Sequence, residues 1–371
     1  MQVFHHGDSA RHDPDRYFRR GEIVGHPEQA ERYHLLLEAV RAGGHAVRET
    51  GDSGLEPILA VHDAGYVAFL REVWDRRGEL PGRADEILTG HFARPHMHRR
   101  PEGLLGLIGL YTADTSTPVR AGTWAAVYGS AQAAIAAADA ALAGTCAYAL
   151  CRPPGHHAYA DSAGGFCYVN NSAIAAERLR AATGGRIAIL DIDVHHGNGT
   201  QGIFYARPDV LTVSVHADPA DYFPYFAGYA DETGTGAGEG FNRNLPLPQG
   251  SGDAPWLAAI GEGLAAIARY RPSALVVALG LAARQEDGAC RRHRLRRPGQ
   301  LRRQALGPGG GGRRRRGHAG RDPGPDPVCH GASRAGGSGS RAPRGGVRPA
   351  RPTAIPSVSY THLTLPTILL V

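Results

Sequence analysis

The sequence predicts an α/β protein built around a central, mostly parallel β-sheet with helices on both faces. In its second half, short apolar runs alternate with segments of helical spacing, a pattern typical of parallel sheets covered on both sides. Polar motifs rich in histidine and aspartate follow the apolar runs, at the strand ends where such folds place their chemistry. With 371 residues the chain can bury a sizeable core.

The first half contains two segments with apolar residues at helical spacing, residues 28–42 and 125–143. Between them, residues 95–121 are interrupted by proline, glycine and threonine, which predicts a long loop. Loops of this length in compact domains are often functional. The alternation then runs through residues 147–151, 172–182, 186–191, 199–206, 210–215, 255–269 and 274–279.

Charge and cysteine content exclude several classes of function. The formal net charge is +6, but the basic excess is concentrated in residues 291–351, so we expect no nucleic-acid partner for the preceding part. The five cysteines are odd in number and form no CxxC pair, which argues against a disulfide framework and a cysteine zinc site. No apolar run is long enough to cross a bilayer, so we expect a cytoplasmic protein without a membrane partner.

The last quarter of the chain has a different composition. Residues 291–351 are Arg, Gly, Pro and Ala without an apolar period, which predicts disorder. A nucleic-acid-binding arm is the alternative, but interleaved aromatic residues are missing. This composition is also what a GC-rich gene yields when it is read in a shifted frame, and residues 357–371 look like translated adaptor DNA. We therefore divide the chain into a catalytic domain (1–281), an out-of-frame segment (282–356) and an adaptor-like end (357–371).

Asp193 and His195 are candidate metal ligands. They lie two residues apart where a predicted strand ends, so both side chains leave the same face and can meet one ion. Nitrogen and oxygen donors of this kind suit zinc. The alternative, a capped loop with solvated polar side chains, is disfavoured because a second loop with two histidines precedes this one.

His156 and His157 follow a rigid Pro-Pro-Gly turn. Two imidazoles beside a Lewis acid suit metal-assisted amide hydrolysis, because one can accept a proton from water and the other can balance charge and donate. Asp191 and Asn198 could each hold one imidazole in its working tautomer. A surface turn is the alternative for an isolated histidine pair.

Four long motifs of this sequence resemble those of a known protein family: RPPGHHA, GGFCYVNN, DIDVHHGNGTQ and DPADYFPYFAGYADETGTGAGEG. They resemble segments of the histone deacetylase and acetylpolyamine amidohydrolase family, in the expected order and within residues 1–281. The resemblance implies the three-layer α/β/α arginase–deacetylase fold with its C-terminal part missing, and zinc-dependent hydrolysis of an acyl amide that releases acetate and an amine.

The resemblance also implies residue roles. His157 would be the general base and His156 its electrostatic partner, with Asp191 behind His156 and Asn198 behind His157. Asp193 and His195 would be two of three ligands of one catalytic zinc ion. A structural potassium ion would be held by backbone carbonyls of Asp191, Asp193 and His195 with Ser214 and Val215, and a narrow tunnel would be lined by Gly165, Phe166 and Phe223.

The sequence departs from the family at two points. The third zinc ligand is expected as an Asp in an LGxD pattern, and this chain has Ala282 there. The tyrosine of an EGGY-like turn, which polarises the substrate carbonyl, has no counterpart. Because two protein ligands hold zinc weakly and a lost oxyanion donor costs about 100-fold or more in rate, we expect the chain as written to be impaired.

The substrate is left open between an acetylated polyamine and a protein acyl-lysine. Glu102 and Asp114 are the acids that the 95–121 loop offers to a polyamine. Long loops of this kind build a dimer interface in the polyamine enzymes, so a homodimer is expected. A degenerate, non-catalytic binder of acylated amines is the alternative from another class of function, and an arginase-like metallohydrolase is a third.

Overall fold

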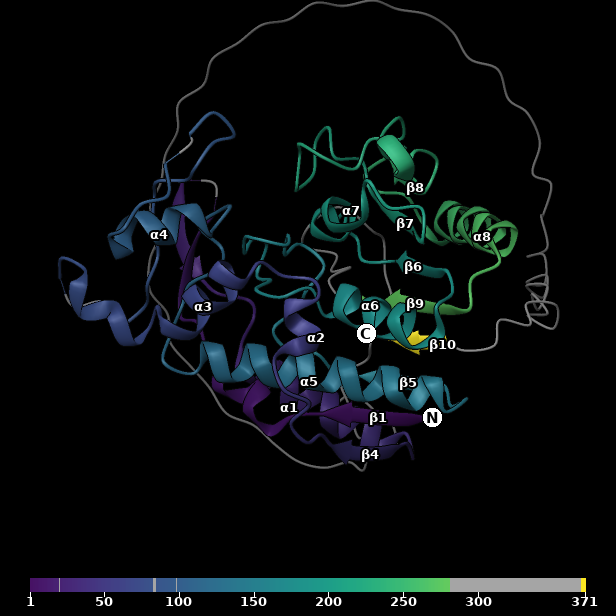
Figure 1. Ribbon diagram of the computed structural model, residues 1–371, viewed down its shortest axis with the longest axis horizontal. Coiled ribbons are helices and arrows are strands. Elements are labelled where there is room, and N and C mark those ends of the chain that lie inside the picture. Colours follow the sequence, from purple (N-terminus) through teal and green to yellow (C-terminus); the bar gives the residue numbers. More distant parts are fainter. Residues whose placement is uncertain (20, 83–84, 98, 281–367) are drawn as a thin grey trace, which may run out of the picture. The chain divides into compact units, whose positions relative to one another are not determined.

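The computed structural model describes residues 1–19, 21–82, 85–97, 99–280 and 368–371. Within this part of the chain, eight strands form one sheet in the order β4-β1-β5-β10-β9-β6-β7-β8, and every neighbouring pair is parallel. A separate antiparallel hairpin is formed by β2 and β3. Helices lie on both sides of the large sheet (Figure 1).

The strands are short, as is usual for a sheet buried on both faces. Their bounds are β1 Gln2–His5, β2 Arg16–Arg19, β3 Glu22–Gly25, β4 Ala46–Glu49, β5 Ala147–Ala149, β6 Ile187–Asp191, β7 Val210–Ala217, β8 Asn242–Leu247, β9 Ala274–Ala278 and β10 Ile368–Leu370. The helices are α1 Ala30–Ala42, α2 Glu56–Leu59, α3 Ala64–Glu72, α4 Leu104–Leu110, α5 Thr123–Leu142, α6 Asn171–Thr183, α7 Asn198–Phe204 and α8 Asp253–Tyr270.

Successive side chains of the central strands point to opposite faces of the sheet, and each face packs against its own layer of helices. On β6, Ile187 and Ile189 pack into a core with α5 and α6, whereas Ala188 and Leu190 pack into a second core with α8. Strand β9 divides its side chains in the same way. Helix α8 therefore covers one face of the sheet, and α5 and α6 cover the other (Figure 1).

The predicted three-layer α/β/α fold with a mostly parallel sheet is confirmed. The helices expected at 28–42 and 125–143 correspond to α1 and α5, and the later alternation corresponds to β5, α6, β6, α7, β7, α8 and β9. The prediction of one long loop at 95–121 was wrong, because α4 interrupts it. Leu104, Leu107 and Ile108 of α4 are buried and recur at helical spacing.

Near the C-terminus, residues Ile368–Leu370 form β10 between β5 and β9. Residues 282–356, predicted to be out of frame, lie outside the described residues, as do residues 357–367. None of the helices in the described part combines the length and apolar character that a membrane crossing needs.

Candidate active site

The polar motifs follow β5 and β6 at the carboxyl edge of the sheet. The turn with His156 and His157 comes after β5, and the loop with Asp193 and His195 comes directly after β6. Because parallel strands end at the same edge, the two loops meet there. The rings of His156 and His157 are 3.9 Å apart, and those of His157 and His195 are 5.8 Å apart.

His156 is paired with a buried carboxylate. Its Nδ1 donates to Asp191 Oδ2 at 2.8 Å, and the other Asp191 oxygen accepts from the backbone N–H of Asp193 at 3.0 Å. Burial lowers the pKa of His156, but the charge of Asp191 and its hydrogen bond outweigh burial and raise the pKa to about 9. His156 is therefore the cationic member of the pair at neutral pH.

His157 is paired with a neutral amide. Its Nδ1 donates to Asn198 Oδ1 at 2.6 Å, which leaves Nε2 with a free lone pair. Burial holds the pKa of His157 well below its ordinary value, and the neighbouring rings of His156 and His195 act in the same direction. A neutral imidazole with a free Nε2 is the form that a general base requires.

Asp193 and His195 present two donor atoms side by side. His195 Nδ1 lies 3.0 Å from Asp193 Oδ1, which also accepts from the His195 backbone N–H at 2.8 Å. Burial opposes ionisation of Asp193, but its hydrogen bond with His195 and the charge of His156 hold its pKa below the ordinary range. The other carboxylate oxygen faces Gly280, where a Cβ would come within 1.8 Å of it.

The donor atoms of Asp193 and His195 are of the types that bind zinc, but they are only two. A catalytic zinc site has three protein ligands, whereas among the described residues no group of three His, Cys, Asp or Glu side chains could hold a metal ion. The chain leaves Gly280, beside Asp193, towards Ala282, the expected position of the third ligand. Ala282 lies outside the described residues, as does the segment in which the tyrosine was sought.

Glycines allow the loops to approach the histidines. At Gly165, whose φ is +55°, a Cβ would come within 2.4 Å of the His157 ring. At Gly197 it would come within 2.3 Å of Asp191 Oδ2, and at Gly199 within 2.2 Å of the Ala158 carbonyl oxygen. The glycines of the Gly197-Asn198-Gly199 run are thus a packing requirement of the site as well as part of a motif.

Aromatic rings stand beside the histidines. Phe223 meets the His157 ring edge-on at 5.0 Å and the His195 ring at 6.0 Å. Phe166 lies against Tyr17 at 5.5 Å and His26 at 4.6 Å. The two predicted tunnel phenylalanines therefore belong to two aromatic groups, one on the histidines and one on the N-terminal segment.

The two acids proposed for the substrate differ in their surroundings. Asp114 Oδ2 accepts from the backbone N–H of Gly165 at 2.8 Å, and its Oδ1 accepts from the Ser116 backbone at 2.8 Å. Asp114 is thus joined to Gly165, which was predicted to line the tunnel, whereas Glu102 is exposed, just before α4.

The residues expected to hold potassium also lie together. Asp191 of β6 faces Ser214 of β7 in the sheet register, and Val215 follows, fully buried. The Ser214 hydroxyl is bonded to His216 Nδ1 at 2.8 Å.

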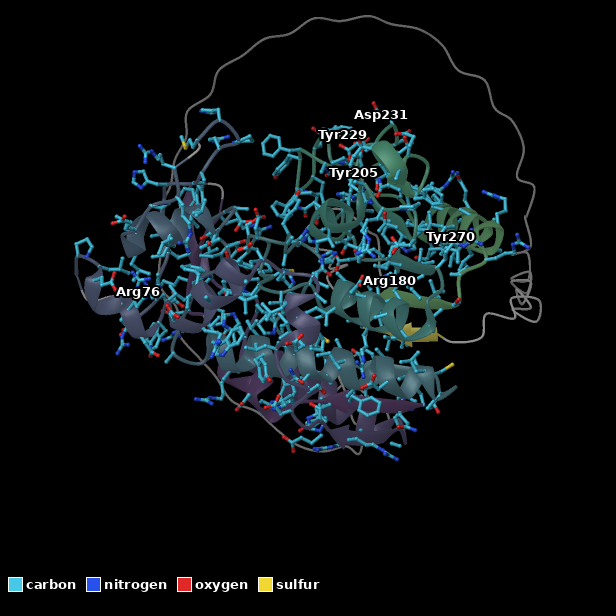
Figure 2. The ribbon with its side chains drawn as sticks, viewed as in Figure 1. Arg76, Arg180, Tyr205, Tyr229, Asp231 and Tyr270 are labelled. Atoms are coloured by element: carbon cyan, nitrogen blue, oxygen red, sulfur yellow. The ribbon has the colours of Figure 1, made fainter. Side chains whose placement is uncertain are left out.

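Sequence patterns missed several residues that line this region. Tyr222 stacks on His195 at 5.0 Å with an interplanar angle of 19°, and Tyr17 and His26 back Phe166. Tyr222 could have been found from its place beside Phe223. Tyr229 and Asp231 lie on the same long loop that follows β7 (Figure 2).

Comparisons with known proteins identify a family. The histone deacetylase domain family matches residues 26–299. An acetylpolyamine amidohydrolase of Burkholderia pseudomallei is 46% identical over 289 residues, which cover 77% of this chain and 84% of that protein. Acetylpolyamine amidohydrolase 1 of Pseudomonas aeruginosa is 48% identical over 240 residues, covering 64% of this chain and 69% of that protein.

The fold comparison gives the same result. A crystal structure of the acetylpolyamine aminohydrolase from Burkholderia pseudomallei superposes with a TM-score of 0.75 at 46% identity, covering 78% of this chain and 84% of that one. The fold and the histidine site define a deacetylase-type amidohydrolase. The chain belongs to the histone deacetylase domain family.

Proposed function

We propose that the chain acts on the acetyl or acyl amide of a polyamine or a lysine side chain, releasing acetate and a free amine. The main observation in support of this proposal is the pair of imidazoles in the turn after β5, one hydrogen-bonded to a carboxylate and one to an amide. Several relatives of known sequence are acetylpolyamine amidohydrolases, which supports the same chemistry here.

The two histidines have different roles in the proposed reaction. His157 accepts the proton of the attacking water at Nε2, because Asn198 holds the proton of the other ring nitrogen. His156, charged against Asp191, stabilises the negative charge that develops on the acyl oxygen.

Metal dependence is part of the proposal. Asp193 and His195 would hold the zinc ion, which when bound supplies Lewis acidity towards the acyl carbonyl. A potassium ion held by carbonyls of Asp191, Asp193 and His195 with Ser214 and Val215 would stabilise the loop after β6. The pairing of Asp191 with Ser214 across β6 and β7 supports this second site.

The aliphatic arm of the substrate would pass between Gly165, Phe166 and Phe223, whose aromatic surface suits methylene groups. Glu102 and Asp114 would meet the ammonium groups of a polyamine. A protein acyl-lysine is the alternative substrate. A homodimer and a cytoplasmic location stay predictions.

A non-catalytic member that binds acylated amines is the second candidate function. Ala282 at the position of the third ligand favours it. A chain with Ala282→Asp and the missing tyrosine restored that binds acetylputrescine, yet does not hydrolyse it, would support this alternative.

The hydrolysis proposal is tested with His157→Ala in a chain that carries Ala282→Asp and in which the tyrosine of the EGGY-like turn has been restored. We expect kcat for acetylputrescine or an acetyl-lysine peptide to fall by about 100- to 10,000-fold, the range of a lost general base, while zinc affinity measured by calorimetry is unchanged. Replacement of the exposed His45 by Ala is the control. Loss of zinc in the His157 variant would make His157 a ligand and overturn its assignment as the base.

A further inference from the structure

Arg152 is a buried cation at the start of the turn with the catalytic histidines. It is 2% exposed and precedes Pro153, four residues before His156. Its Nε donates to Glu28 Oε1 at 2.8 Å, and Glu28 is itself 5% exposed. A buried charge of this kind is costly unless its hydrogen bonds are satisfied.

The remaining bonds of the guanidinium go to the N-terminal segment. One terminal nitrogen donates to the Ser9 carbonyl at 2.5 Å, and the other donates to the carbonyls of His12 at 2.5 Å and Glu28 at 2.9 Å. The Arg152 side chain thus donates to four acceptor atoms, and these belong to residues that lie between 124 and 143 positions earlier in the chain. Lysine could not replace it, because an ammonium is a point donor without the planar fork.

The same N-terminal segment packs against Phe166, a residue that we propose for the tunnel wall. The backbone N–H of Glu28 donates to His26 Nδ1 at 3.1 Å, and His26 Nε2 donates to the Ser116 carbonyl at 3.1 Å. The His26 ring packs against Phe166 at 4.6 Å, and Tyr17 packs against both rings. Arg152 therefore joins the histidine turn on one side to the support of Phe166 on the other.

The histidine turn is held elsewhere by side chains from the sheet-covering helices. The Pro153 carbonyl accepts from Ser130 Oγ at 3.1 Å and from Asn171 Nδ2 at 3.2 Å. The Ala158 carbonyl, one residue after His157, accepts from Asn170 Nδ2 at 3.1 Å. These bonds fix the turn to α5 and α6, and Arg152 adds its connection to the tunnel wall.

We infer that Arg152 is a positioning residue, which sets the catalytic histidine turn in register with the tunnel wall formed by Phe166, His26 and Tyr17. The inference rests on the proposed hydrolytic function for its catalytic meaning. A buried ion pair is a poor source of net stability compared with apolar packing, whereas it specifies one arrangement of the groups that it joins. Proton transfer at His157 depends on that arrangement.

The test compares Arg152→Lys with Arg207→Lys in the full chain. Arg207 is a matched control because it also forks onto a carboxylate, Asp209, at 3.0 and 2.7 Å, but lies before β7 at the opposite edge of the sheet. The readout is the imidazole nitrogen NMR signals of His26 and His157, assigned with His26→Gln and His157→Gln. We expect Arg152→Lys to shift both signals and Arg207→Lys to shift neither, although both lower Tm.

Unshifted signals in a folded Arg152→Lys chain would overturn the inference and leave Arg152 a structural residue only. If that variant does not fold, Glu28→Gln replaces it, because it removes the charge of the partner and keeps the carbonyl acceptors; the same two signals must then shift. In a hydrolysing Ala282→Asp background we expect Arg152→Lys to lower kcat by about 100-fold with KM little changed. The NMR readout needs no turnover, so a failure of the proposed hydrolysis is distinguishable from a failure of this inference.

Discussion

At the scale of single residues, the metal site depends on position 282. Asp193 and His195 present two donors, and Gly280, which lies beside Asp193, precedes Ala282 by two residues in the sequence. We expect Ala282→Asp to tighten zinc binding by at least about tenfold, since a third ligand adds more than about 1.4 kcal/mol. Calorimetric titration of the two chains with zinc measures the difference.

The neighbouring alanine provides the control. Ala283→Asp adds the same charge one residue further along, and we expect it to leave zinc affinity unchanged, because a ligand must reach the ion with defined geometry. Equal tightening by both substitutions would indicate a general electrostatic effect. No tightening by either would place the third ligand elsewhere.

The residues that could be predicted from sequence are those whose partners are close in the chain or follow a motif. Asp193 and His195 are two residues apart, and the histidine pair is contiguous. The support of the site is different: Arg152 and Glu28 are separated by 124 positions, and no local pattern indicates that they meet. His26 and Tyr17 reach Phe166 only through the tertiary fold.

At the scale of elements, α7 must pack closely against the histidine turn. The backbone conformation of a helix accommodates alanine at any position. At Gly199, however, a Cβ would meet the backbone of Ala158 at 2.2 Å. Since backbone cannot rotate away, we expect Gly199→Ala to destabilise the protein by about 1–3 kcal/mol. Urea unfolding followed by circular dichroism measures this free energy.

Helix α8 contains the matched control for the same chemical change. Gly261 is exposed, and a Cβ there would meet nothing within 4 Å. Gly261→Ala should therefore stabilise the protein by up to about 1 kcal/mol through helix propensity alone. A Gly199→Ala chain as stable as the parent would show that α7 can shift away from the turn without cost.

Most elements of the second half follow from the sequence, because strands such as β6 and β9 are short, largely apolar runs that each follow a helix. The N-terminal strands do not. Strand β4 has three exposed residues around Val47, of which Arg48 and Glu49 are charged, and it joins the sheet as an edge strand beside β1. Its assignment depends on pairing across more than 40 residues, which periodicity cannot indicate.

At the scale of the whole molecule, the continuity of the sheet depends on β10. Strands β5 and β9 do not pair with each other; Leu369 and Leu370 pair with β5 on one side and with β9 on the other. Leu369 is fully buried in the core beneath α5 and α6, and Leu370 packs towards the core beneath α8. Leu369 and Leu370 thus contribute to one core each, and β10 covers two strand edges that would otherwise be open to other chains.

This arrangement predicts a large effect of a charge at Leu369. We expect Leu369→Asp to lower the free energy of unfolding by about 3 kcal/mol or more, because a carboxylate would be buried without a partner. Leu257→Asp on α8 is the control, since Leu257 is 60% exposed and its replacement should change stability by no more than about 0.5 kcal/mol. Urea unfolding of the three chains gives both values. Equal stabilities of the two variants would mean that β10 does not belong to the cooperative core, and that β5 and β9 are edges of two separate halves of the sheet.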